Sequence, residues 1–496
     1  MDVLMAATPI LLALVLYPTR LPGWVPPAAG ALAALLLALT WFETSGAQIL
    51  QTVGTGAWTL VEVMAIIAGG VLLSRVMDRT GAQARLAGWL SSGGGPTVAA
   101  ALLMVHGVVP FMETVTGFGV SVMIGLPLLL GFGFTPYRAA LLTLLGLMIG
   151  PWGSMGPGTL LASQDAGVTL QEMGLASGVM NGVAFLASGL VAAVIAGRGT
   201  AHGADADGRP LPLRRIPPAA VLTWLGAGVV SAVVLWGLVL VANLVLGTPV
   251  AGAVATLVVS LLWLLVLRRG RLRPGPGRPL VPYLVLMGGT VAGQLLHRSL
   301  GLGTIGEVIS SPALWSFTAA LTAAWLLHQA RNQHSVVLRD AGRLWMQAGR
   351  PTALYMVLGV MVAGGGLAAV MGQALTGLGP AYLFLVPFVG GLSGYITASG
   401  TGANAMVGSI QVAAAQSLGV SPLWLMAVQN SSAGWGIIAG PARVELAYRL
   451  AMPHQRPDHR GLTATRRNLL AVLVPTVLAS LVVYGLISVL LLPATG

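Results

Sequence analysis

The residues of this chain that could do chemistry lie in two short runs of small and polar residues inside apolar segments. The first run spans residues 111–119 and contains Glu113, and the second spans residues 396–404. Glycine lets the backbone turn tightly and approach a ligand, and hydroxyl and free N–H groups can donate hydrogen bonds to it. An acidic side chain inside an apolar segment is costly and indicates function by default. The two runs therefore predict a binding site for a carboxylate, in which Glu113 gains and loses a proton.

The candidate substrate-binding residues share small, polar or cationic side chains at or beside a break in an apolar segment. Arg443 could form a fork-like pair with a substrate carboxylate, or it could be the permanent counter-ion of an acidic residue. Small residues could also serve only to let helices pack closely, and Glu113 could be a structural carboxylate. We predict that substrate is bound by Thr114, Thr116, Gly117, Gly119, Ser154, Ser399, Thr401, Gly402, Asn404, Asn430, Ser431 and Arg443.

Two further titratable residues lie within apolar segments. We expect His106 to be a neutral, hydrogen-bonded histidine rather than a proton relay, and Glu62 to make a structural pair rather than contact substrate. The chain has no cysteine, which excludes thiolate metal sites. Its 13 acidic residues form no Asp-rich motif, so we expect neither a metal nor another cofactor.

The breaks belong to an internal repeat. Gly81 follows Gly70 by eleven residues, and Gly377 follows Gly366 at the same spacing. Paired Gly/Pro interruptions of hydrophobic segments in two halves of a chain point to the binding site of a transporter. Further landmarks follow in the same order in both halves: Thr116-Gly117 and Thr401-Gly402, Pro136 and Pro422, Trp152-Gly153 and Trp435-Gly436, Pro157 and Pro441.

Composition places these segments in a membrane. Of the 496 residues, 56% are hydrophobic and 8% are charged, whereas a soluble domain carries about 25% charged residues. We predict an all-α polytopic membrane protein with about 12 transmembrane helices and two re-entrant hairpins, at residues 94–133 and 380–420. The predicted crossings lie near residues 3–19, 25–42, 56–76, 136–163, 171–196, 217–246, 249–267, 280–297, 313–330, 352–372, 422–446 and 465–492.

The arginines give these segments a direction. The positive-inside rule makes the face that carries them cytoplasmic, so both termini lie outside the inner (plasma) membrane. The segment 56–76 then runs inward and its counterpart 352–372 outward, which makes the repeat inverted. The two hairpin tips would meet near the midplane of the bilayer, where inverted-repeat transporters place their substrate. The net charge of +12 comes from arginines in loops between the apolar segments, so it does not indicate binding to nucleic acid. These arginines gather in residues 75–85, 198–215, 268–273, 331–350 and 456–467.

The same arrangement predicts how the chain is organised. We expect scaffold helices and two transport repeats, each with a hairpin and a broken helix. The predicted parts are N-terminal scaffold helices at 1–93, a first transport repeat at 94–196, central linking helices at 197–351, a second scaffold helix at 352–379, a second transport repeat at 380–464, and a C-terminal helix at 465–496.

Several motifs resemble the bacterial L-lactate permease family: residues 113–119, 131–136 and 153–156 in the first half, and 398–404 and 428–434 in the second. The resemblance covers roughly residues 56–196 and 352–446. It implies proton-coupled transport of lactate or glycolate, a hairpin-bearing domain that moves like an elevator against a scaffold, and often a homodimer. Val120-Ser121 stands where the family usually has a proline, and Arg443 departs from the family pattern. An extra positive group would suit a different or larger carboxylate.

We therefore expect a secondary transporter that imports a small 2-hydroxymonocarboxylate with a proton. The alternative of the same architecture is a sodium-coupled or dicarboxylate carrier, in which hairpin carbonyls, Thr401 and Asn404 would ligate Na⁺. A membrane-embedded enzyme acting on lipid is a distant alternative, because such enzymes need metal-binding carboxylates or a nucleophile–base set. A channel is a further alternative, which saturable uptake with counterflow would exclude.

Overall fold

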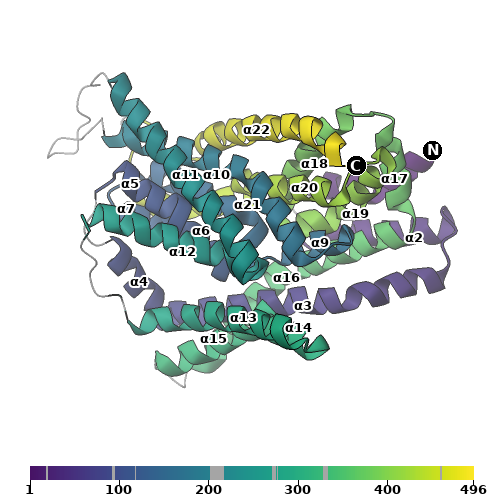
Figure 1. Ribbon diagram of the computed structural model, residues 1–496, viewed down its shortest axis with the longest axis horizontal. Helices are drawn as coiled ribbons and strands as arrows, with labels where there is room; N and C mark the ends of the chain where they lie inside the picture. The colour runs from purple at the N-terminus through teal and green to yellow at the C-terminus, as the bar shows by residue number, and fades with distance from the viewer. Residues whose placement is uncertain are drawn as a thin grey trace.

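The computed structural model describes residues 1–17, 21–91, 95–117, 119–200, 217–270, 275, 277–327, 333–458 and 461–495. These residues form helices and connecting turns, without a β-strand, and most helices follow the long axis of the molecule (Figure 1). Phe118 of the first polar run and several loop arginines, such as those at 209–215, 271 and 273, lie outside the described residues.

One order of elements occurs in both halves: a long helix, a short helix, a helical hairpin, a broken helix and a closing helix. The first half contains α3 (Gly46–Arg79), α4 (Ala82–Ser91), the hairpin α5–η1–α6 (Val98–Leu102, Leu103–Val108, Val109–Val115) with α7 (Val120–Gly131), the broken helix α8 (Pro136–Leu145), η2 (Gly146–Met155) and α9 (Pro157–Asp165), and α10 (Leu170–Thr200). The second half contains α16 (His334–Gly364), α17 (Leu367–Thr376), the hairpin α18 (Ala381–Thr397) with α19 (Gly400–Leu418), the broken helix α20 (Pro422–Gly436), η5 (Ile437–Ala439) and α21 (Pro441–Ala451), and α22 (Arg466–Leu491).

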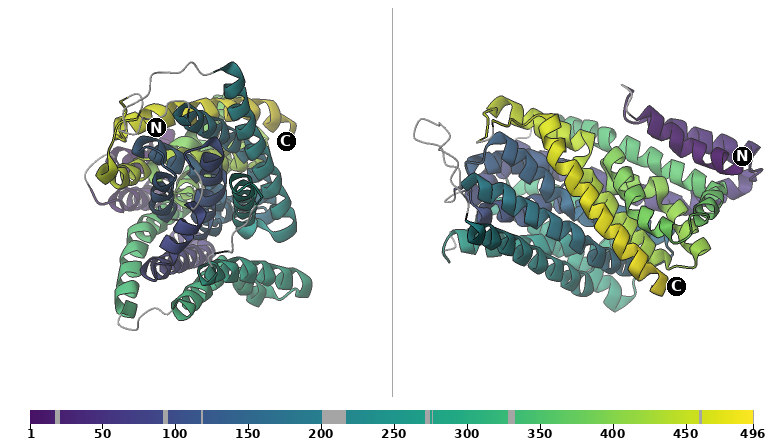
Figure 2. Two further views of the ribbon diagram at one scale, coloured as in Figure 1. Left: turned by 90° about the vertical axis from the view of Figure 1, so that its left-hand side faces the viewer. Right: turned by 90° about the horizontal axis from the view of Figure 1, so that it is seen from above.

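The remaining helices flank these two sets. They are α1 (Asp2–Leu16), α2 (Val25–Thr40), α11 (Pro218–Leu246), α12 (Thr248–Leu267), α13 (Val281–Leu300), α14 (Gly303–Ser310) and α15 (Pro312–Leu326). Helix α15, which precedes α16 in the chain, packs on α3. Helix α2, which precedes α3, packs on α16. Figures 1 and 2 show α13 and α15 as a separate layer beneath α3.

The long helices α3 and α16 run antiparallel. Gly364, at the end of α16, faces Thr52 near the start of α3. At the opposite ends, Arg79 of α3 pairs with Asp340 of α16. Between these contacts the Trp345 indole N–H donates to the carbonyl of Met64 at 3.1 Å. Opposite directions for the first helices of the two halves are what an inverted repeat requires.

The first hairpin folds back on itself. Ser121 of α7 faces Glu113 of α6, and a Cβ on Gly125 would meet Val109 one turn further from the tip. A Cβ on Gly133, after the second arm, would lie 3.5 Å from Pro96, before the first arm. The second arm has 12 residues, about 18 Å of helix, which is too short for a hydrocarbon core of about 30 Å. Whether both hairpins are re-entrant stays a prediction.

The first broken helix bends by 71° between η2 and α9. Its backbone is left-handed at three successive residues, Ser154 (φ 44°), Met155 (φ 67°) and Gly156 (φ 82°). Such a conformation costs about 1–3 kcal/mol at each non-glycine residue and persists only where the surroundings impose it. Pro157 then starts α9, because proline lacks the N–H that a continuing helix would need.

The second break is shorter than the sequence suggested. The small residues and the proline from 430 to 441 favour an interruption over that whole stretch, but α20 runs unbroken through Gly436, and the chain leaves helical geometry only at Gly440 (ψ 136°), before Pro441. The glycines and serines of this stretch are tolerated inside the helix because they allow close packing against neighbouring elements.

The expected 12 crossings are not all matched by helices of spanning length among the described residues. Within the described residues, seven helices are long and apolar enough to span a bilayer, or nine if two bent pairs each count as one span. Helices α1 and α2 have 15 and 16 residues and fall short of that length. Helix α16 begins at His334 rather than near residue 352, since its arginine-bearing first half lowers the hydropathy without disfavouring a helix. The helices still indicate a multi-pass membrane protein.

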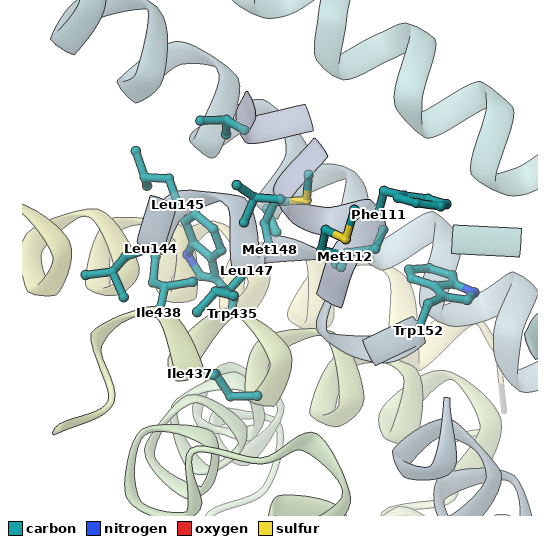
Figure 3. Close-up of a cluster of buried hydrophobic side chains, with 14 of the residues drawn as sticks. Phe111, Met112, Leu144, Leu145, Leu147, Met148, Trp152, Trp435, Ile437 and Ile438 are labelled. Atoms are coloured by element: carbon teal, nitrogen blue, oxygen red, sulfur yellow. The ribbon is translucent and has the colours of Figure 1, made fainter. Parts of the chain in front are cut away.

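The buried side chains form two clusters. The larger holds the first hairpin, the broken helices and α10 to α12, and the smaller holds α1, α2 and the facing parts of α3, α16 and α19. Trp152 and Trp435, which occupy equivalent positions in the two halves, are fully buried. Figure 3 shows both indoles in the larger cluster, together with Phe111, Met112 and Ile438.

Candidate functional site

The hairpin tips and the helix breaks surround a cavity of about 280 Å³. Glu113 and Gly117 line it from the first hairpin, residues 397–402 line it from the second, and Arg443 lines it from α21. The cavity lies where the two buried clusters meet, because Tyr355 on its wall belongs to the smaller cluster and Leu147 and Ile437 belong to the larger. The structure thus brings both polar runs of the sequence to one place.

Glu113 and Arg443 form an ion pair on the wall of this cavity, with 3.5 Å between Glu113 Oε1 and Arg443 Nη2. Their side chains are 10% and 11% exposed. The Ser121 hydroxyl donates to the other oxygen of Glu113, and Arg443 Nη2 also donates to the carbonyl of Ala398 at 3.4 Å. Arg443 Nε is buried and has no hydrogen-bond partner in the described structure. Both contacts of Nη2 are long, which leaves the guanidinium of Arg443 with capacity for another anionic ligand.

Three helices begin at the cavity wall. Gly158 lies in the first turn of α9, Gly400–Gly402 form the first turn of α19, and Ala442 lies in the first turn of α21. The first N–H groups of a helix have no partner within the helix, and its dipole favours a negative charge there. The Ser399 hydroxyl accepts from Gly402 N at 3.2 Å, which caps α19. This arrangement can bind a carboxylate.

Glycine contacts bring the two halves together beside the cavity. A Cβ on Gly150 would lie 2.3 Å from Gly434 Cα, and a Cβ on Gly158 would lie 2.9 Å from the backbone of Gly400. Only glycine permits these distances between backbones. At these positions the small residues therefore serve close helix packing, and they also form part of the cavity wall.

Of the residues predicted from the sequence, Glu113 and six candidate substrate-binding residues line the cavity: Gly117, Ser154, Ser399, Thr401, Gly402 and Arg443. Thr114, Thr116, Gly119, Asn404, Asn430 and Ser431 do not. The hydroxyls of Thr114 and Thr116 donate to carbonyls of their own helix, at 2.7 and 2.6 Å. A Cβ on Gly119 would lie 2.8 Å from Arg443 Nη1, so this glycine makes room for the guanidinium.

Asn404 and Asn430 instead form a buried network behind the wall. Asn404 Nδ2 donates to the carbonyl of Gly158 and to Asn430 Oδ1, both at 2.9 Å. Asn430 Nδ2 donates to Thr159 and Ser177 of the first half, and Ser431 donates to the carbonyl of Ser177. The network fixes α9 and α10 against α19 and α20. Direct contact of these residues with substrate stays a prediction.

Sequence reasoning missed the contribution of α16. Gln347, Thr352 and Tyr355 of this helix line the cavity on the side facing the hairpins. Their spacing puts them on one helix face, and three polar side chains on one face of a membrane helix were a usable signal. The signal was lost because the predicted helix began only at residue 352.

The other titratable candidates lie outside this cavity. His106 is fully buried within a π-helical turn, with Nδ1 2.8 Å from the Ser231 hydroxyl and Nε2 3.0 Å from the Ser188 hydroxyl. Glu62 lines a separate cavity of about 80 Å³ beside Gln294 and Ser311. Among the described residues, no group of three or more His, Asp or Glu side chains could hold a metal ion.

Comparisons with known proteins show which family the chain belongs to. The sequence profile of the family described as L-lactate permease matches residues 2–205 and 304–449. An L-lactate permease from Streptococcus iniae is 22% identical over 346 residues, which cover 66% of this chain and 72% of that protein. One from Salmonella typhi is 29% identical over 134 residues, 26% of this chain, and the chain thereby spans only 24% of that relative's length. The glycolate permease GlcA of Escherichia coli (strain K12) is 33% identical over 82 residues, 16% of this chain and 15% of the relative. The profile covers well over half of the chain, which therefore belongs to the L-lactate permease family.

Proposed function

We propose that this protein is a secondary transporter that imports L-lactate, glycolate or a closely related 2-hydroxymonocarboxylate by proton symport. The observation that carries the proposal is the Glu113–Arg443 pair on the wall of a small cavity between two hairpin tips. Relatives named L-lactate permease and glycolate permease support the substrate class.

In this proposal the substrate carboxylate lies against Arg443 and the first turn of α19. Arginine binds carboxylates through parallel hydrogen bonds, and Arg443 lines the cavity with only long contacts to Glu113 and Ala398. The first-turn N–H groups of α19 and the Thr401 hydroxyl complete the anion site. A volume of about 280 Å³ suits a small monocarboxylate.

Coupling to protons would follow from competition for Arg443. While Glu113 is ionised, it holds the guanidinium. A proton on Glu113 weakens that pair and frees Arg443 for substrate, so proton and substrate favour each other's binding. Linkage makes this effect reciprocal, with a typical coupling free energy of about 1–3 kcal/mol.

A second cavity, of about 440 Å³, supports a route to the opposite side. Its wall includes Thr52, Gly56 and Thr59 of α3. A shift of 296 positions, the separation of Gly70 and Gly366, maps these residues onto Ala348, Thr352 and Tyr355 of α16, which line the first cavity. Two cavities related by the repeat fit an inverted-repeat, elevator-type transporter in the inner membrane, with both termini outside and the arginine-rich face in the cytoplasm.

Counterflow in proteoliposomes tests the proposal. Vesicles loaded with unlabelled L-lactate or glycolate should take up the labelled acid, with saturation, and uptake driven by an inward proton gradient should vanish with a protonophore and persist without sodium. Dependence on sodium would favour the sodium-coupled carrier, and linear uptake without counterflow would favour a channel. A chemically altered product would replace the transporter with an enzyme.

A further inference from the structure

The break of the first half carries a strained serine on the wall of the substrate cavity. Ser154 has φ 44° and ψ 48°, in the left-handed region that residues with a side chain rarely adopt. It is 5% exposed and lines the cavity, and its hydroxyl has no hydrogen-bond partner among the residues that the structure describes. Strained residues of this kind cluster at ligand-binding sites, where the surrounding structure holds them in place. Since buried polar groups are normally hydrogen-bonded, this hydroxyl is available to a ligand.

Two glycines of the repeat make room for this hydroxyl. A Cβ on Gly70 of α3, or on Gly117 at the tip of the first hairpin, would lie 3.1 Å from Ser154 Oγ. A Cβ on Gly117 would also lie only 2.7 Å from Ser154 Cβ. Side chains at these two positions would therefore displace the serine from the cavity wall.

Ser154 lies beside the proposed anion site. A Cβ on the preceding residue, Gly153, would lie 3.9 Å from Glu113 Oε1, the oxygen that faces Arg443. In a 2-hydroxy acid the hydroxyl is attached to the carbon next to the carboxylate. The partner of that hydroxyl must therefore lie next to the group that holds the carboxylate, and Ser154 meets this requirement.

The repeat gives Ser154 an apolar counterpart. Trp152-Gly153 and Trp435-Gly436 are equivalent landmarks of the two halves. The residues that follow them, Ser154 and Ile437, are therefore equivalent as well. Both line the cavity, and Ile437 is 6% exposed. At equivalent positions the first half thus offers a hydroxyl and the second half a hydrocarbon group.

We propose that these two residues recognise the groups on carbon 2 of the substrate: the Ser154 hydroxyl hydrogen-bonds the 2-hydroxyl, and Ile437 contacts the alkyl group. This assignment rests on the proposed function, in which Arg443 holds the carboxylate. A serine hydroxyl can donate to the 2-hydroxyl or accept from it. An acid without a 2-hydroxyl leaves Ser154 unpaired, and a site that is built to hydrogen-bond a substrate hydroxyl discriminates against such an analogue.

Competition in proteoliposomes tests the assignment of Ser154. Unlabelled acids compete with labelled L-lactate in counterflow by the full chain. We expect L-lactate to inhibit at a concentration about two- to twelve-fold lower than propionate, which lacks the hydroxyl, because one hydrogen bond has this worth. Ser154→Gly should bring the ratio to about one by weakening inhibition by L-lactate and not by propionate. Glycine adopts φ 44° without strain, so this variant should unfold at no lower temperature than the unaltered chain.

A second variant tests the alkyl contact. L-Lactate has one methyl group more than glycolate, and Ile437→Ala should lower the preference for L-lactate over glycolate by about four-fold, the worth of one buried group of this size. The ratio between L-lactate and propionate should stay the same in this variant. Ser163→Ala is the matched control, because the Ser163 hydroxyl donates to the carbonyl of Leu160 in its own helix, α9. Both ratios should be those of the unaltered chain.

An unchanged ratio between L-lactate and propionate in Ser154→Gly would overturn the assignment. Loss of that ratio in Tyr355→Phe instead would also overturn it, because Tyr355 lines the same cavity from α16. An unchanged ratio between L-lactate and glycolate in Ile437→Ala would contradict the alkyl contact. Absence of all counterflow by the unaltered chain would overturn the proposed function itself, so the two failures are distinguishable.

Discussion

Glu113 and Arg443 lie 3.5 Å apart although they come from different halves of the chain, one from the first hairpin and one from the second broken helix. Their pairing explains how two costly charges are tolerated inside apolar surroundings. Removing one member of a buried pair leaves an uncompensated charge, at a cost of about 3–5 kcal/mol. The same pair places a proton acceptor beside the group best suited to hold a carboxylate.

Replacing Glu113 with glutamine should separate transport from proton coupling. Glutamine keeps the shape and can still accept from Ser121, but it leaves Arg443 permanently free. We expect Glu113→Gln to retain counterflow of L-lactate while accumulation driven by a proton gradient falls by about 5- to 150-fold, the range of typical coupling free energies. Uptake into proteoliposomes at several imposed gradients measures this. The control is Glu307→Gln, at an exposed carboxylate on α14. Undiminished gradient-driven accumulation by Glu113→Gln would contradict the role of Glu113 in proton coupling.

Replacing Arg443 should affect both stability and binding. Arg443→Gln leaves the Glu113 carboxylate without a charged partner, so the free energy of unfolding should fall by about 3–5 kcal/mol. The double variant Glu113→Gln with Arg443→Gln should recover most of that stability but not substrate binding. Thermal unfolding and equilibrium binding of labelled L-lactate measure the two effects. Wild-type affinity in the double variant would show that Arg443 is only a counter-ion.

Much of this site follows from residue type and order. The glycine, serine and threonine runs at the tips, and the prolines that begin α9 and α21, act through local backbone preferences, which sequence reveals directly. The Glu113–Arg443 contact could not be deduced, because it depends on how two distant segments pack. From the sequence, Arg443 was either a substrate-binding residue or the counter-ion of an acidic residue. In the structure Arg443 both pairs with Glu113 and lines the cavity.

Packing also explains what the sequence did not predict. Residues 430–436 are rich in small residues that usually mark a break, but neighbouring backbones use that space and α20 stays helical. The first half of α16 is polar enough to escape a hydropathy search, yet its arginine-bearing turns extend a membrane helix and bring Gln347 to the cavity. Asn404 and Asn430 resembled ligand-binding residues, and the structure places them in a network joining the two halves.

The crossing of the two broken helices should tolerate no side chain. A Cβ on Gly150 would lie 2.3 Å from Gly434 Cα, and backbone cannot move aside as the end of a flexible side chain can. We expect Gly150→Ala to lower the free energy of unfolding by about 1–3 kcal/mol or more, measured by thermal unfolding in detergent. Gly237→Ala in α11, where a Cβ meets nothing within 4 Å, should leave stability unchanged or slightly raised. Equal stability of the two variants would contradict the close approach.

His106 should matter for stability and not for coupling. Its two ring nitrogens face the hydroxyls of Ser188 and Ser231, and a serine hydroxyl does not hold an imidazolium as a carboxylate would. We expect His106→Ala to cost about 1–3 kcal/mol, because buried partners lose hydrogen bonds, while the pH dependence of L-lactate uptake stays as in the unaltered chain. A shifted pH profile would instead support a proton relay through this residue.

The two cavities should be reached from opposite sides of the membrane. Because the chain has no cysteine, single cysteines at Thr397 in the first cavity and Gln164 in the second can be labelled without background. A membrane-impermeant thiol reagent should reach Thr397→Cys from the arginine-rich face and Gln164→Cys from the other face, and L-lactate should slow labelling at Thr397→Cys. The unaltered chain, which should take no label, is the control. Labelling of both positions from one face would mean that the cavities do not form the two halves of a transport route, and the inverted arrangement proposed for them would fail.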